Sequence, residues 1–86
     1  MGPNKVILVL QRGWVVVGDL AEDGETKVQL VNASVIRRWG TTQGLGELAL
    51  KGPLKATVLD ACGVVEAHPA AIVLRIPCDA AAWAGK

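Results

Sequence analysis

The chain has 86 residues, which predicts one domain over 1–86 in which about two-thirds of the unfolded chain's surface can be buried. Hydrophobic residues are 51% of the sequence and aromatic residues 3%, all of them tryptophan, so Val, Leu, Ile and Ala must fill the core. The formal net charge of +1 gives no general attraction to a polyanion and argues against bulk nucleic-acid binding. No apolar run reaches the roughly 18 residues of a membrane-spanning helix, so we expect a cytoplasmic protein with no membrane contact.

Two apolar runs at the start of the chain, 6–10 and 14–20, are separated by a short polar segment and predict a β-hairpin. Both runs are nearly continuous rather than alternating, which indicates strands covered on both faces by another sheet, a helix or a neighbouring subunit. A core without large side chains gains stability when copies of the chain share it. The sequence therefore predicts a homo-oligomer.

The next strand follows a polar turn over 21–25, where Asp23 and Gly24 are expected to supply a positive φ. It begins near Thr26 and alternates between apolar and polar residues, as a half-exposed strand does. Residues 32–34, Asn-Ala-Ser, predict a bend or bulge within it.

A short helix is predicted over 43–51, capped by the hydroxyl of Thr41 or Thr42 and ended by the Gly-Pro pair at 52–53. Two glycines weaken it, at about 1 kcal/mol each relative to alanine. That cost is reasonable where something must approach the backbone closely.

The last third contains three short apolar segments, 55–59, 63–67 and 71–76, which predict a three-strand meander. Asp79 is placed to cap a final helical turn that ends at Trp83, an anchor for the core or for a partner subunit. The fold class is therefore mainly β (α+β), a small antiparallel sheet or partly open barrel of about six short strands with one short helix.

Catalytic chemistry is not predicted, because the one histidine, His68, precedes a proline in a turn and has no nucleophile motif near it. Two cysteines are too few for a disulfide framework and are interpreted as packing residues. A zinc site from Cys62, His68, Cys78 and either Asp60 or Asp79 has suitable donors but no recognised spacing. We expect no enzyme activity, no cofactor and no metal.

The ligand-binding candidates are concentrated in residues 37–46, Arg-Arg-Trp-Gly-Thr-Thr-Gln-Gly-Leu-Gly. An arginine can fork onto phosphate or carboxylate oxygens, and an indole can stack on a base or ring. Hydroxyls and backbone amides at a strand-to-helix junction can complete an anion site. The predicted ligand-binding residues are Arg37, Arg38, Trp39, Thr41, Thr42 and Gly44.

A purely structural interpretation of the same segment stays open. In it, Trp39 packs over the sheet, the arginines are solvated or pair with acidic residues, and the glycines allow close helix packing. The pattern is neither a Walker A loop nor a dinucleotide fingerprint, so the residues alone leave both interpretations standing.

Three stretches resemble small uncharacterised proteins of bacteriophages and prophages: 33–42 (Ala-Ser-Val-Ile-Arg-Arg-Trp-Gly-Thr-Thr), 44–49 (Gly-Leu-Gly-Glu-Leu-Ala) and 59–63 (Leu-Asp-Ala-Cys-Gly). The resemblance implies a phage setting, and hence the host cytoplasm, but no established activity. Small phage proteins of this kind include virion or accessory components and binders that sequester nucleotide immune signals of the host.

Two functions follow as expectations. The first is a non-catalytic, oligomeric binding protein that holds a nucleotide or similar small anion through residues 37–46. The second is a structural or protein-interaction module, a virion or accessory component, in which the apolar strands 6–10 and 14–17 join across subunits. Single-strand nucleic-acid binding ranks below both, because one indole beside two arginines can stack a base but the net charge gives little steering.

Overall fold

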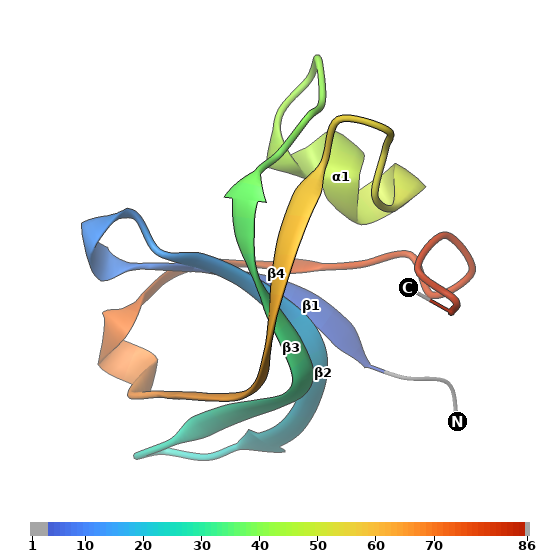
Figure 1. Ribbon diagram of the computed structural model, residues 1–86. Helices are drawn as coiled ribbons and strands as arrows, with labels where there is room; N and C mark the ends of the chain where they lie inside the picture. Colours follow the sequence, from blue (N-terminus) through green and yellow to red (C-terminus); the bar gives the residue numbers. More distant parts are fainter. Residues whose placement is uncertain (1–3, 86) are drawn as a thin grey trace.

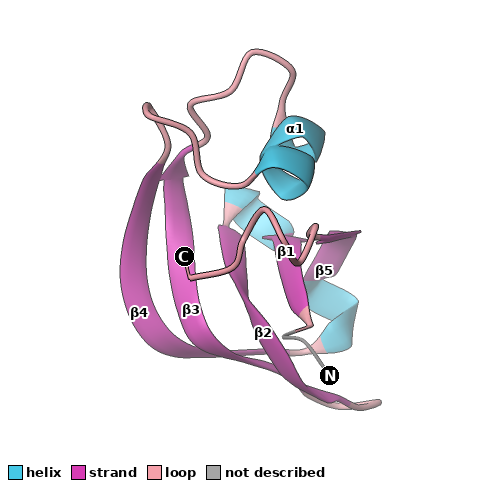
Figure 2. Ribbon diagram, turned by 90° about the vertical axis from the view of Figure 1, so that its right-hand side faces the viewer, coloured by secondary structure: helices cyan, strands magenta, loops and turns pink. Residues whose placement is uncertain are grey.

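The structure, a computed structural model, describes residues 4–85 and contains one antiparallel sheet of five strands in the order β4-β3-β2-β1-β5 (Figure 1). The elements are β1 (Lys5–Leu10), the 3-10 turn η1 (Gln11–Gly13), β2 (Val15–Asp23), β3 (Val28–Arg38), α1 (Leu45–Lys51), β4 (Val58–Ala67), the 3-10 turn η2 (Pro69–Ala71) and β5 (Ile72–Pro77). The mainly β prediction with one short helix is confirmed. The strands number five rather than about six, and the sheet bends strongly without closing (Figure 2).

Both faces of the central strands are buried, as their continuous apolar sequences predict. On one face Ile7, Val15, Val17 and Ile36 pack against Leu48 and Ala49 of α1 and against Trp83. On the other face the curl of the sheet encloses a second cluster, formed by Val6, Leu8, Val16, Val28, Leu30 and Ala33. Alternate residues of one strand therefore lie in two different hydrophobic clusters, one on each face of the sheet.

The predicted hairpin of β1 and β2 is confirmed, with Val9 opposite Val15 and the Leu10 amide donating to the Trp14 carbonyl at 2.7 Å. Both strands are interior, because β5 pairs with the free side of β1 and β3 with that of β2. Strands 6–10 and 14–17 therefore offer no free backbone edge to another subunit, and their joining across subunits stays a prediction. Their backbone groups are already paired within one chain.

The turn between β2 and β3 lies later than predicted, because β2 continues to Asp23 and β3 begins at Val28 rather than near Thr26. The Gly24 amide donates to the Lys27 carbonyl at 2.9 Å. Gly24 does not have a positive φ, so the expected role of the Asp-Gly pair is wrong. A four-residue loop reverses the chain without it.

The predicted bulge at 32–34 is confirmed by register shifts in the pairings of β3 with β2 and β4 and by the positive φ of 50° at Asn32. The segment Asp60-Ala61-Cys62, expected to separate two strands, lies inside β4, where a second shift at Cys62 offsets the first. One bulge on each strand restores the register, so β4 is continuous.

The predicted meander of the last third is wrong as well. After η2 the chain crosses to the far edge of the sheet, where β5 pairs with β1 and not with β4. Ile76 lies opposite Ile7 and Leu74 opposite Val9, so the apolar residues of β5 extend the apolar surface of β1. Within residues 4–85, no helix is long and apolar enough to cross a membrane.

The helix α1 ends at Lys51 before Gly52, as predicted, but begins at Leu45, because Gly44 has a φ of 85° that is incompatible with a helix. The capping role of Asp79 is confirmed, since its carboxylate accepts the Ala82 amide at 3.0 Å. Trp83 is 3% exposed in the core, and its indole Nε1 donates to the carbonyls of Leu48 and Ala49 at 3.2 and 3.1 Å. The C-terminal turn thus fastens α1 to the sheet.

Candidate functional site

Residues 37–46 begin at the end of β3 with an arginine that is already engaged. Arg37 forms a two-point ion pair with Asp60 on β4, with Nε to Oδ2 at 2.9 Å and a second guanidinium nitrogen to Oδ1 at 3.0 Å. The hydrogen bond to Asp60 raises the pKa of Arg37 further, so the guanidinium stays charged. The sequence did not predict Asp60 as the partner of Arg37, because the two residues are far apart in the chain and meet only through the pairing of β3 with β4.

The loop that precedes α1 also satisfies its own donors. The Glu47 carboxylate accepts the amides of Gln43 and Thr42 at 2.8 and 3.0 Å and lies 3.3 Å from the Thr42 hydroxyl. The hydrogen bond from Gln43 contributes most to lowering the pKa of Glu47. Thr41 donates to the Gly44 carbonyl at 2.9 Å instead of capping the helix. A carboxylate of the chain therefore occupies the position expected for a bound anion.

The glycines in residues 37–46 have different structural roles. A Cβ on Gly40, which has a φ of 68°, would lie 2.3 Å from the Ala56 carbonyl carbon, so Gly40 allows the 54–57 turn to pack against the chain. Thr57 fixes that turn by donating to the Trp39 carbonyl at 2.6 Å. Gly44 and Gly46 have no atom of another residue within 4 Å of their Cβ positions, so no part of the described chain explains them by close approach.

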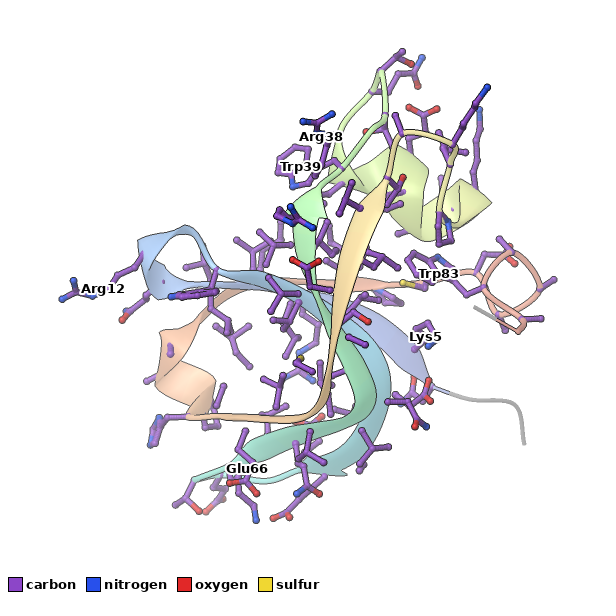
Figure 3. All side chains as sticks on the ribbon, viewed as in Figure 1. Lys5, Arg12, Arg38, Trp39, Glu66 and Trp83 are labelled. Atoms are coloured by element: carbon purple, nitrogen blue, oxygen red, sulfur yellow. The ribbon has the colours of Figure 1, made fainter. Side chains whose placement is uncertain are left out.

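Arg38 and Trp39 remain available for binding. Trp39 is 42% exposed, and Arg38, also exposed, forms no ion pair among residues 4–85. Figure 3 shows the two side chains next to each other at the end of β3, directed away from α1. Of the predicted ligand-binding residues, these two combine an exposed ring with a free charge.

Trp14, which the sequence analysis placed only as a strand residue, is 58% exposed at the start of β2. Val16 at the start of β2 pairs with Val35 near the end of β3, so Trp14 and Arg37, two positions further along, lie at the same end of the sheet. The sequence did not indicate this proximity, because the turn between β2 and β3 lies later than predicted and the register shifts within the pairing. Trp14 therefore joins the candidate site.

The residues considered for a metal site are spread over the molecule. Cys62 lies on β4 and Cys78 follows β5, at opposite edges of the sheet. Within the described part of the chain, no group of three or more His, Cys, Asp or Glu side chains could hold a metal ion. His68 accepts the Ala70 amide at 3.0 Å and so caps η2.

In the folded protein at pH 8, iodoacetamide is expected to alkylate Cys62 much faster than Cys78. Cys62 is exposed, whereas burial raises the pKa of Cys78 to about 11 despite the nearby Lys5. The thiolate is the nucleophile, and only about one Cys78 thiol in a thousand is ionised at pH 8, so its alkylation is slow. Mass spectrometry of tryptic peptides 56–75 and 76–86 measures each site. Equal rates at pH 8 would contradict this pKa.

Comparison with known proteins adds no assignment. No protein family model matches the sequence, and no curated protein matches it.

Proposed function

We propose that the chain is a non-catalytic binding module that holds a nucleotide or a similar anion with a planar ring at the end of β3. The observation that carries this proposal is the exposed indole of Trp39 beside the unpaired charge of Arg38. The guanidinium donates two parallel hydrogen bonds to a phosphate, and the indole face accepts a base. Asp60 engages Arg37, and Glu47 engages the amides of Thr42 and Gln43. A phosphate therefore reaches those two amides only by displacing Glu47.

A bacteriophage or prophage origin, with action in the host cytoplasm, belongs to the same proposal. Its support is the resemblance of residues 33–42, 44–49 and 59–63 to small phage proteins. A phage product that sequesters a nucleotide needs a pocket and no catalytic set, which agrees with a site made of an indole and arginines.

Thermal denaturation with mono-, di- and cyclic nucleotides tests this function. A ligand at a hundred times its Kd stabilises the folded state by about 2.7 kcal/mol, which raises Tm by roughly 10 °C or more for a domain of this size. We expect Arg38→Ala to remove the shift and Lys27→Ala, which deletes an exposed cation next to the β2–β3 turn at the other end of β3, to retain it. The proposal fails if no nucleotide shifts Tm or if Arg38→Ala keeps the full shift.

A second candidate, a self-associating structural module, is favoured by the edges of the sheet. The outer sides of β4 and β5 are unpaired within the described chain, and these strands expose Val64, Val73 and Leu74 by 56%, 69% and 51%. Long apolar edges are templates for pairing with another chain. The homo-oligomer is therefore proposed to form through β4 and β5 rather than through β1 and β2.

Sedimentation velocity at micromolar concentration tests the second candidate. A lysine on an edge strand opposes pairing by its charge, so Val73→Lys is expected to shift the protein to monomer. Leu50→Lys is the matched control, because Leu50 on α1 is 67% exposed but lies on no sheet edge. A wild-type monomer, or equal dissociation by both variants, would argue against association through the edges.

A further inference from the structure

Two of the three tryptophans, Trp14 and Trp39, are exposed in a chain that has no Phe or Tyr. An indole offers the largest buried area of any side chain, and the core of this small protein consists mostly of Val, Leu, Ile and Ala. Only Trp83 serves that core. Exposed apolar groups that gather on one face indicate an interaction site.

The two exposed indoles lie at the same end of the sheet. Trp14 immediately precedes β2 and Trp39 immediately follows β3, and these two strands are antiparallel neighbours. In Figure 3, Arg38 and Trp39 project from the end of β3, and Arg12 stands apart from them at the tip of the hairpin of β1 and β2. We call the surface formed by Arg12, Trp14, Arg37, Arg38 and Trp39 the two-indole face.

The net charge of +1 hides a strong separation of charge. The two-indole face has three arginines and one neighbouring acid, Asp60, and among residues 4–85 Arg12 and Arg38 form no ion pair. Acidic residues gather instead at the β2–β3 turn and the facing end of β4, where Glu22, Asp23, Glu25 and Glu66 lie. Lys27 and Arg75 pair with three of these four acids, so this end keeps a smaller acidic excess of two charges. A local excess of positive charge steers an anion to one face even when the whole protein is almost neutral.

We propose that the ligand of the two-indole face is single-stranded nucleic acid, with one base stacked on Trp14, another on Trp39, and backbone phosphates held by Arg38 at the end of β3 and by Arg12 beyond Trp14. This inference rests on the proposed function and names its ligand class. Two indoles among cations match two rings joined by an anionic backbone, the arrangement of proteins that bind single strands. A mononucleotide uses only one of the indoles, and a duplex keeps its base faces inside the stack.

Fluorescence anisotropy with a fluorescein-labelled thymidine 12-mer tests the inference. Stacking of one base is worth about 5- to 150-fold in Kd, so Trp14→Ala and Trp39→Ala are each expected to weaken binding by that factor. Trp14→Phe, which keeps a stacking ring, is expected to recover most of the affinity. Two phosphate contacts, one from Arg12 and one from Arg38, predict a slope of about −1.4 for log K against log salt concentration, and Arg12→Ala is expected to make that slope shallower by about 0.7.

The same variants with thymidine monophosphate separate this inference from the proposed function. Trp14→Ala is expected to weaken the 12-mer and leave mononucleotide binding at Trp39 intact. If the wild type binds mononucleotide but gains nothing with the 12-mer, or if Trp14→Ala has no effect, the inference is overturned and the proposed function stands. If neither probe responds to Arg38→Ala and Trp39→Ala, both fall. Equal binding of a duplex or of a polyglutamate peptide of equal charge shows charge attraction alone and also overturns the inference.

Discussion

Replacing Trp83 with alanine is expected to destabilise the protein by about 3–5 kcal/mol, the usual cost of deleting a buried large aromatic side chain. Trp83 is 3% exposed, packs against both the sheet and α1, and donates to two carbonyls at the end of that helix. A chain of this length has roughly 4–13 kcal/mol of total stability. The variant is therefore expected to lose roughly a quarter or more of that stability, with a fall in Tm of at least about 12 °C.

Urea denaturation followed by circular dichroism measures this effect. Trp14→Ala is the matched control, because Trp14 is 58% exposed and its loss is expected to change stability by no more than about 0.5 kcal/mol. Trp83→Phe keeps a ring but removes the indole donor, and it is expected to fall between the two. If Trp83→Ala and Trp14→Ala lose similar stability, the C-terminal turn does not hold α1 against the sheet.

Lys5→Met is expected to cost about 3 kcal/mol, because it leaves Asp19 without its countercharge in a mostly buried position. Lys5 is 8% exposed, its Nζ lies 3.2 Å from Asp19 Oδ1, and it is 5.9 Å from the centre of the Trp83 ring. That Asp19 oxygen accepts no hydrogen bond among the described residues, and the other oxygen accepts one from Asn32 at 3.2 Å. Charge attraction to Lys5 therefore offsets most of the cost of burying the Asp19 carboxylate.

The double variant Lys5→Met and Asp19→Leu separates attraction from desolvation. A buried ion pair replaced by apolar residues of similar size is often neutral, so the double variant is expected to be more stable than Lys5→Met alone. Urea denaturation of the wild type, both single variants and the double variant yields the interaction energy. If the costs simply add, the two charges do not interact, and the contact at 3.2 Å contributes nothing.

Local sequence patterns predicted the local features well. The β1–β2 hairpin, the bulge at Asn32, the end of α1 at Gly52 and the roles of Asp79 and Trp83 all depend on residues close in the chain or on a single bulky side chain in an otherwise small core. The partner of β5 depends on β1, about 65 residues earlier. Nothing in the composition of residues 71–76 distinguishes pairing with β1 from pairing with β4.

The sequence predicted where the candidate site lies, but it did not predict the ion pair and hydrogen bonds within the site. Arg37 and Asp60 meet through the pairing of β3 with β4, and Trp14 reaches the same end of the sheet through the register of β2 with β3. Glu47 is close in sequence to the loop amides that it binds, those of Gln43 and Thr42. This contact depends on the positive φ of Gly44. The predicted helix began at Gln43 and therefore did not include that conformation.

The strand order has a consequence for folding during synthesis. β1 is made first, yet one side of it stays unpaired until residues 72–77 are available, and the core around Ile7 is completed only when Trp83 arrives. Contacts that join the beginning and end of a chain slow folding, and an unpaired apolar strand is prone to aggregation while it waits. The nascent chain is therefore expected to gain its stable fold only after nearly all of it has left the ribosome, and until then to depend on chaperones that cover β1.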